Sequence, residues 1–461
     1  MNRLLSLIIC LFGINSVWSQ SVLSLPLSSS PLVIKEVSII SPKTKKVIPN
    51  QTIIIIDGKI NTIAPSGKIS LPPDGQVIEG KGKFLIPGIA ELHAHIPVPD
   101  SSNDLTALSQ TLFLYLSNGV TTIRGMLGQP YHLKINETLA ARSMRNIPRI
   151  YTSSPSFNGN SVPDIQTAEK LVRQYKAEGY HFLKIHPGIK REVYDGLART
   201  AKEVGIDFAG HIPVEVGVTH AIQSGQLTVD HLDGYIEALA PPLADLTQNG
   251  FFGFNLTDKA DMAKLKGLID LTKQKGTWIV PTQSLFTRWF SPTDPNQMMQ
   301  ELELSYMPSR TRFAWTQSKS NLIKNPEYSE ARFNRFLDIR KKILFAMHQS
   351  NVNLLLGSDA PQVMNVPGFS LQHEMKSWAD AGIPNWKILQ ASTSEVARFF
   401  KAENQFGDVA KGLVADLVLL DHNPVDDIKH MQSIAGVINK GIWISKAQID
   451  SELNRISQAN Q

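Results

Sequence analysis

The chain has almost no cysteine: Cys10 is the only one among its 461 residues. Cys10 lies inside the short apolar stretch 4–12, and bulky Ile9 precedes it where a lipoprotein signal would have a small residue, so we expect no lipid anchor. Cleavage near Ser19 would leave a mature chain without a thiol. Disulfides and thiolate ligands are then excluded, and any metal ion must be bound by nitrogen and oxygen atoms.

Long apolar runs and dense basic runs are missing as well. No segment approaches the roughly 20 apolar residues that a membrane-spanning helix needs. The net charge is +5, but lysine and arginine are scattered, so we predict no nucleic-acid partner. Residues 1–20 have a charged start, a short apolar core and a small-residue exit, which is typical of a secretory signal peptide.

These features predict an exported protein, periplasmic or extracellular, with no membrane association once the signal is removed. The expected partner is a small molecule or a short peptide, and a homo-oligomer stays open as an alternative. A hydrophobic content of 42% is enough for a large core.

Both ends of the chain show strand patterns. Runs rich in β-branched residues lie within 32–86 and again within 412–444, with Asp57-Gly58 as a tight turn. Because chain termini often lie close together, we predict a small β-sandwich domain built from both chain ends. Its two parts would be residues 21–86 and residues 405–461, with residues 1–20 as the signal peptide.

Between these ends, helix-like and strand-like segments alternate, which is typical of α/β proteins. A glycine repeatedly ends a helical pattern just before a strand, as the left-handed position after a helix requires, and Asn351 substitutes for it once. Eight strand-like runs predict a (β/α)₈ TIM-like barrel over residues 87–404, with its site at the strand C-terminal ends. The runs are 89–92, 120–123, 149–152, 182–185, 208–210, 227–229, 278–280 and 352–356.

The stretch 286–330 interrupts this alternation after the seventh strand. It is rich in Trp, Met, Pro and Ser and is longer than loops usually are. We predict that it forms a lid or a wall over the barrel mouth and contributes to substrate choice.

Histidines stand at the ends of several predicted strands. His93 and His95 are separated by one residue, so on a strand both side chains point the same way and can bind one ion. His211 and His231 each follow another strand-like run. Each alone also fits a solvent-facing or buried structural histidine, but neutral imidazole is the commonest metal ligand. Four of the 12 histidines at strand ends therefore favour a metal site.

Lys184 and Asp359 complete the set. A lysine inside a barrel is unfavourable unless it is paired or altered, although it could also extend to solvent. Carbon dioxide added to its neutral amine would give an anionic carbamate whose two oxygens can bridge two metals. Asp359 follows the eighth run, where it could be a helix N-cap or could bind metal and accept a proton from an attacking water.

Taken together, the chain resembles the amidohydrolase superfamily, in the branch similar to imidazolonepropionases and Xaa-Pro dipeptidase-like enzymes. The resemblance covers nearly all of the mature chain. It includes the segment 88–95, Gly-Ile-Ala-Glu-Leu-His-Ala-His, the segment 119–124, Gly-Val-Thr-Thr-Ile-Arg, and the tail 407–421.

The resemblance implies two divalent metal ions, with zinc as the first expectation. His93, His95 and Asp359 would bind one metal, His211 and His231 the other, and carboxylated Lys184 would bridge them. Asp359 and His231 would be catalytic. Tyr235, Arg124, Arg288 and His186 are the predicted substrate contacts, although Tyr235 also fits surface packing and His186 also fits a strand cap.

The predicted activity is hydrolysis of a carbon–nitrogen bond by a metal-activated hydroxide. The substrate would be a dipeptide such as Xaa-Pro or an N-acyl amino acid. Two alternatives remain: a cyclic amide hydrolase resembling imidazolonepropionase, and a non-catalytic binding protein on an amidohydrolase scaffold.

Overall fold

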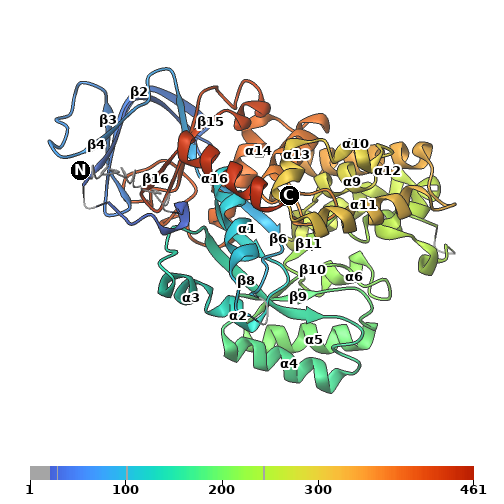
Figure 1. Ribbon diagram of the computed structural model, residues 1–461. Helices are drawn as coiled ribbons and strands as arrows, with labels where there is room; N and C mark the ends of the chain where they lie inside the picture. The colour runs from blue at the N-terminus through green and yellow to red at the C-terminus, as the bar shows by residue number, and fades with distance from the viewer. Residues whose placement is uncertain (1–20, 29, 100–101, 242–243) are drawn as a thin grey trace, which may run out of the picture.

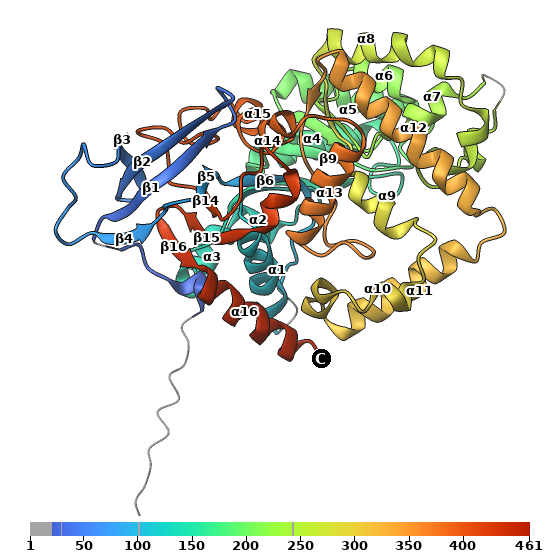
Figure 2. The same cartoon turned by 90° about the horizontal axis from the view of Figure 1, so that it is seen from above.

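The structure, a computed structural model, describes residues 21–28, 30–99, 102–241 and 244–461, so the predicted signal peptide lies outside the described residues. Two sheets of eight strands organise the chain (Figure 1). Figure 2 shows the N-terminal strands together with β14 to β16 on one side of the molecule, and helices α8 to α12 on the other. Within the described part, every helix is too short or too polar to cross a bilayer.

The first sheet joins the two ends of the chain, as the sequence predicted. Its order is β16-β15-β14-β5-β1-β2-β3, and β4 also pairs with β1. β5 lies between the two ends, parallel to β1 on one side and antiparallel to β14 on the other. The strands are β1 Leu32–Ser41, β2 Lys46–Ile56, β3 Lys59–Pro65, β4 Gln76–Glu79, β5 Phe84–Pro87, β14 Leu417–Leu420, β15 Ile434–Asn439 and β16 Ile442–Ser445.

Alternate residues of β5 belong to two different hydrophobic cores. Leu85 is fully buried in a cluster of residues from the first sheet, whereas Ile86 is fully buried in the large core of the second sheet and its helices. This alternation follows from the two-residue period of a strand. The short strand β5 therefore contributes side chains to the cores of both sheets.

The second sheet is a curled parallel sheet with the order β13-β12-β11-β10-β9-β8-β7-β6. Each of the eight runs predicted from sequence overlaps one of its strands. The strands are β6 Ile89–Ala94, β7 Val120–Gly125, β8 Arg149–Phe157, β9 Phe182–Ile185, β10 Asp207–Gly210, β11 Thr228–Asp230, β12 Trp278–Val280 and β13 Asn353–Leu354.

Backbone hydrogen bonds join the two edges of this sheet. The Leu92 amide donates to the Leu356 carbonyl at 3.0 Å, and the Asp359 amide donates to the His93 carbonyl at 2.9 Å. Ala94 also forms a parallel bridge with Ala360. These bonds bring the chain after the last strand against the first strand.

Helices follow most strands of the second sheet, and the predicted glycine positions end them. Gly119, Gly179, Gly205, Gly225 and Gly276 all have φ between 67° and 92°, and Asn351 has φ 57°. The helices are α1 Thr106–Ser117, α2 Pro130–Leu133, α3 Ile135–Ala141, α4 Ile165–Glu178, α5 Arg191–Val204, α6 Val218–Gln223, α7 Tyr235–Leu239, α8 Leu265–Lys275, α9 Gln283–Trp289, α10 Pro295–Met298, α11 Ser309–Ile323, α12 Glu330–Gln349, α13 Phe369–Asp380, α14 Asn385–Ser392, α15 Ser394–Phe399 and α16 Lys446–Ala459.

The stretch 286–330 is helical. It contains the end of α9, then α10, the 3-10 helix η5 at Leu302–Tyr306, and α11. Figure 2 shows α10 and α11 at the edge of the molecule, near the C-terminal end of the chain. The remaining 3-10 helices are η1 Val22–Ser24, η2 Leu246–Gln248, η3 Phe251–Lys259, η4 Met262–Lys264 and η6 Ile428–Gln432.

Candidate metal centre

Two histidines and a carboxylate meet where the edges of the second sheet join. Asp359 Oδ1 lies 2.7 Å from His95 Nε2 and 3.4 Å from His93 Nε2. One potential ligand atom from each of these three side chains lies within 4.8 Å of the other two. Such a spacing suits a single metal ion bound by two imidazoles and one carboxylate oxygen.

The cluster continues to the other predicted ligands. The His231 ring centroid lies 4.4 Å from that of His93 and 4.6 Å from that of His211. Lys184 Nζ lies 3.4 Å from His93 Nε2, and all these residues except His95 and His211 are buried. The structure therefore brings together all six side chains that the sequence predicted as ligands: His93, His95, Lys184, His211, His231 and Asp359.

Neighbouring side chains orient three of the imidazoles. In each case the Nδ1 atom lies beside an oxygen, which leaves Nε2 for the centre of the cluster, as second partners of metal-bound histidines commonly do. The pairs are His93 with Asp230 Oδ2 at 2.8 Å, His211 with Asp233 Oδ2 at 3.0 Å, and His231 with Thr282 Oγ1 at 2.8 Å.

The donor set fits a divalent metal. The Nε2 atom of His231 is buried and has no hydrogen-bond partner among the described residues, a state that a metal ion would satisfy. Burial lowers the pKa of His211 to about 3 and the pKa values of His93 and His231 well below 6.5. The imidazoles are therefore neutral and have a lone pair to offer.

Lys184 is wholly buried on β9, and this burial lowers the pKa of its amine to about 8. A substantial fraction of neutral amine near pH 8 is the form that can react with carbon dioxide. The carbamate predicted from sequence requires this neutral amine. The backbone amide of Lys184 donates to the Ser154 hydroxyl at 3.1 Å, which positions the residue.

The backbone is left-handed at two of the predicted ligands and at a neighbour of one of them. His231 has φ 63°, Asp359 has φ 67°, and Thr282, the partner of His231, has φ 45°. Non-glycine residues in this region cost of order 1–3 kcal/mol each and persist only when surrounding contacts hold them. Such strain clusters at functional sites, and here it turns strand-end side chains toward one another.

Two buried charged residues that the sequence reasoning missed support these strand ends. Glu91 accepts hydrogen bonds from the backbone amides of His93 at 2.9 Å and Ser358 at 2.8 Å. Arg340, on α12, donates to the carbonyl of His231 at 2.7 Å. Glu91 lies two residues before His93, the same spacing that separates His93 from His95, and this spacing is the signal that could have identified it. Arg340 lies within α12, where no signal in the sequence distinguishes it.

Among the predicted substrate contacts, His186 lies beside the cluster. Its ring centroid is 5.0 Å from that of His211, and its Nδ1 shares a hydrogen bond with the Ser156 hydroxyl. Burial lowers the pKa of His186 to about 2, so the ring is neutral.

Arg124 and Tyr235 are both buried and hydrogen-bonded within the chain, and their contacts with a substrate stay predictions. Arg124 is fully buried and binds the Asp230 carboxylate through NH2 at 2.9 Å. Because Asp230 also contacts His93, Arg124 helps to hold the carboxylate that orients this imidazole. The Tyr235 hydroxyl is buried and hydrogen-bonds Thr272 of α8 at 2.7 Å.

Arg288 is also engaged elsewhere. It is 8% exposed, and its Nε donates to the Met364 carbonyl at 3.0 Å. Its NH2 atom forms ion pairs with Glu301 at 2.5 Å and with Glu303 at 3.2 Å. With these partners the guanidinium is bound to its own chain, and its contact with a substrate carboxylate stays a prediction.

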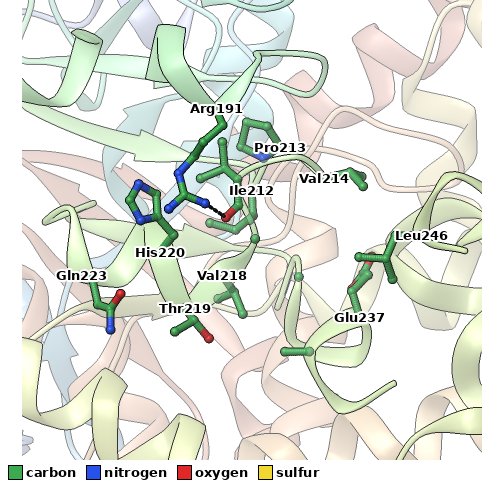
Figure 3. Close-up of a pocket in the computed structure, with 14 residues that line it drawn as sticks. Arg191, Ile212, Pro213, Val214, Val218, Thr219, His220, Gln223, Glu237 and Leu246 are labelled. Atoms are coloured by element: carbon green, nitrogen blue, oxygen red, sulfur yellow. Dashed lines mark hydrogen bonds between the residues drawn. The ribbon is translucent and has the colours of Figure 1, made fainter. Parts of the chain in front are cut away.

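A separate pocket lies behind the loops that carry two of the ligands. It has a volume of about 410 Å³ and is lined by Ile212 and Gly234, close in sequence to His211 and His231, but by none of the six clustered side chains. Figure 3 shows Arg191 at its edge, donating to the backbone carbonyl of Val216. This pocket is therefore distinct from the metal centre.

Comparisons with known proteins agree with this geometry. A profile of the amidohydrolase family matches residues 84–444. A Xaa-Pro dipeptidase solved with methionine in its active site shares 18% identity and a TM-score of 0.62, covering 90% of this chain and 100% of its own. A bottromycin amidohydrolase shares 19% identity and a TM-score of 0.67, covering 93% and 90%.

A curated relative matches only a short segment. The adenine deaminase of Paracoccus denitrificans is 34% identical over 65 residues, which is 14% of this chain and 11% of the deaminase. The chain thus matches a small fraction of the length of that relative. The solved structures, all below 25% identity, show that the fold is shared.

Proposed function

Since this chain belongs to the amidohydrolase family and is a hydrolase of carbon–nitrogen bonds, we propose that it is an exported, metal-dependent enzyme that cleaves a dipeptide such as Xaa-Pro or an N-acyl amino acid. The observation that carries the proposal is the gathering of the six side chains in one cluster, in which neighbouring oxygens orient three of the imidazoles. The methionine in the active site of the similarly folded Xaa-Pro dipeptidase supports an amino-acid product.

His93, His95 and Asp359 would hold one divalent ion, His211 and His231 a second, and Lys184, carboxylated, would bridge them. Zinc suits this nitrogen and oxygen set. When bound, such ions lower the pKa of a water molecule toward 7 and polarise the scissile carbonyl.

The residues of the chain perform the proton transfers and the positioning. Asp359 accepts the proton of the attacking water at its carboxylate and delivers it to the leaving nitrogen. Thr282 holds His231 at Nδ1 and Arg340 holds its backbone carbonyl, so that Nε2 would be directed to the second ion. His186, neutral and held by Ser156, supplies a hydrogen bond to the substrate.

The architecture that we propose around this site extends the curled sheet to a complete (β/α)₈ barrel over residues 87–404. Its edge-to-edge hydrogen bonds support this closure. Residues 21–86 and 405–461 form the second domain, and residues 1–20 direct export.

Metal analysis and one substitution test the function. We expect divalent metal, with zinc foremost, in protein purified without chelators, and a loss of about 10²–10⁴ in kcat for Asp359→Asn, the range for a general acid or base. The matched control is Asp270→Asn, which removes an exposed carboxylate on α8. A folded enzyme without metal, or full activity in Asp359→Asn, would contradict the proposal.

A substrate panel decides among the alternatives. Xaa-Pro dipeptides and N-acyl amino acids are compared with cyclic imides and imidazolonepropionate. Turnover of the cyclic amides alone would replace the peptide assignment with a cyclic amide hydrolase. Tight binding of an intact ligand by metal-free protein, with no turnover, would identify a binding protein.

A further inference from the structure

We infer that Phe252 forms an apolar wall of the acyl subsite and selects substrates whose acyl residue carries a bulky apolar side chain. This inference rests on the proposed function and names the substrate class more narrowly. It concerns a residue outside the stretch 286–330, where the sequence had placed substrate choice.

Phe252 lies directly beside two of the clustered histidines. Its ring centroid is 5.4 Å from that of His231 and 6.1 Å from that of His211, with the latter ring inclined by only 29°. The side chain is partly exposed, whereas His231 is buried. A molecule that reaches these imidazoles therefore meets the phenyl ring as well.

The backbone around Phe252 is held in a strained conformation. Phe252 has φ 56° and ψ 37°, a left-handed conformation that is uncommon for a bulky residue. Gly253 follows with φ 76°, and a Cβ there would lie 2.8 Å from the Cβ of Ile236 on α7. The segment thus packs directly on α7, and this close approach fixes where the ring of Phe252 points.

Hydrogen bonds hold the start of the same segment. The Asn249 side-chain amide donates to Glu237 Oε1 at 2.9 Å, and the Asn255 amide donates to the Asn249 carbonyl at 2.9 Å. A strained residue that its surroundings hold in place is a reason to look for function. Because Phe252 lies beside the candidate metal centre, we infer that its function is to contact the substrate.

The back of the phenyl ring is also aromatic. Phe252 packs edge-to-face on Phe286, with ring centroids 5.0 Å apart, and Phe286 is fully buried. The guanidinium of Arg340 lies 3.6 Å from the Phe286 centroid, but its three nitrogens donate to Gln283, His231 and Pro281. The guanidinium of Arg340 is therefore fully hydrogen-bonded on the far side of Phe286 and does not give the surface at Phe252 a free positive charge.

Such a wall favours apolar groups. A leucine or phenylalanine side chain gains by burial against it, whereas a charged side chain would lose water without forming an ion pair there. His211 and His231 are the residues that, in the proposed function, would hold one of the ions that polarise the scissile carbonyl. The group that lies against Phe252 is then the acyl residue, which carries that carbonyl.

Dipeptides that differ only in the acyl residue test the inference. Leu-Pro, Gly-Pro and Asp-Pro are compared for the wild type, Phe252→Ala and Phe252→Leu. We expect the wild type to prefer Leu-Pro to Gly-Pro by about 10-fold or more in kcat/KM, as hydrophobic pockets do. Phe252→Ala should reduce this ratio to about 3 or less, mainly through KM for Leu-Pro, and Phe252→Leu should retain most of it.

The matched control is Phe251→Ala. Phe251 is the neighbouring phenylalanine, 58% exposed, and its ring contacts Trp289 at 5.7 Å. We expect this variant to keep the wild-type ratio. A ratio unchanged in Phe252→Ala, or lowered equally in Phe251→Ala, would overturn the inference while leaving the peptidase function intact.

A binding measurement separates the two proposals. Calorimetric titration with L-leucine and with glycine should show tighter binding of leucine to the wild type than to Phe252→Ala. If the wild type hydrolyses none of the dipeptides, the proposed function fails, and this titration alone decides the inference. Equal leucine affinities for both proteins would then refute it.

Discussion

Asp230 shows that a single residue can contact residues that lie more than 100 positions away in the sequence. It directly precedes His231, yet its carboxylate contacts Nδ1 of His93 at 2.8 Å and the guanidinium of Arg124 at 2.9 Å. The strand alternation points Asp230 into the sheet interior while the next residue turns to the centre. It thereby couples two strands that lie far apart in the chain.

The six clustered side chains could be predicted because each lies in or shortly after a strand-like run, and the C-terminal ends of parallel strands meet at one edge of a sheet. Their supporting partners could not. A carboxylate near a histidine in sequence does not reveal which ring it reaches, as Asp230 demonstrates. The partners of Arg124 and Tyr235 could not be predicted for the same reason, since both side chains turn into the interior.

Glu374, fully buried on α13, should make stability depend on pH. It accepts hydrogen bonds from the Ser284 amide and from Trp378 Nε1, and burial raises its pKa from 4.5 to about 7. The folded chain therefore holds this proton more tightly than the unfolded chain. Its contribution to stability is fully present below pH 4.5 and is lost as the pH rises through about 7.

We expect the free energy of unfolding of the wild type to fall relative to that of Glu374→Gln between pH 5 and pH 8, by up to about 3 kcal/mol. Urea denaturation at a series of pH values measures the difference. Because other buried carboxyl groups titrate in both proteins, only this difference isolates Glu374. Parallel pH profiles for the two proteins would show that Glu374 does not titrate in this range.

At the scale of elements, strand positions were predictable and strand lengths were not. All eight runs and all the glycine ends of helices are confirmed, because the alternation of periods and the left-handed cap are local signals. The eighth run was expected over 352–356, but β13 is only Asn353–Leu354. The Leu356 amide instead donates to the carbonyl of Ala391 in α14, a contact that no local pattern encodes.

The segment η3 is the clearest omission. Its sequence, Phe-Phe-Gly-Phe-Asn-Leu-Thr-Asp-Lys, has neither a helical nor an alternating period, and its conformation depends on contacts with α7. Segments whose backbone is set by tertiary packing are beyond reasoning from one sequence. Phe252, the residue of the further inference, lies in this segment and outside the stretch 286–330, whose contribution to substrate choice stays a prediction.

Helix α12 supports the ends of two strands through Arg340. The guanidinium donates to the carbonyls of His231 and Pro281, each at 2.7 Å, and to Gln283 Oε1 at 2.7 Å. We expect Arg340→Met to reduce the free energy of unfolding by about 3 kcal/mol, because buried acceptors lose their donors, and to reduce activity as well.

Chemical denaturation and steady-state kinetics check this expectation. The control is Lys342→Met on the same helix, whose exposed ammonium forms an ion pair with Asp338. We expect it to change stability by less than about 1 kcal/mol. Equal losses of stability in the two variants would mean that any positive charge on α12 matters, and not the three hydrogen bonds of Arg340.

At the scale of the whole molecule, β5 joins two cores that would otherwise be separate. Leu85 faces the core of the first sheet and Ile86 faces the core of the second. We expect Leu85→Ala to reduce the free energy of unfolding by about 2–5 kcal/mol, as for other buried leucines. Val47→Ala on β2, where the side chain is 39% exposed, is the control and should change it by about 0.5 kcal/mol or less.

Urea denaturation followed by tryptophan fluorescence and by circular dichroism reports both parts of the molecule. Coincident transitions that shift together in Leu85→Ala would show that the parts unfold as one unit. A shift in only one of two separate transitions would show that β5 does not couple them.

The pairing of β5 with β14 also constrains how the chain acquires its structure during synthesis. β1 to β5 emerge from the ribosome first, yet their sheet lacks β14 to β16 until nearly all of the polypeptide has been made. Contacts with so large a sequence separation form slowly, since a long loop must close before they can. The free edge of β5 therefore stays exposed until β14 has been synthesised. We expect chaperones that bind exposed strand edges to bind the nascent chain at this edge.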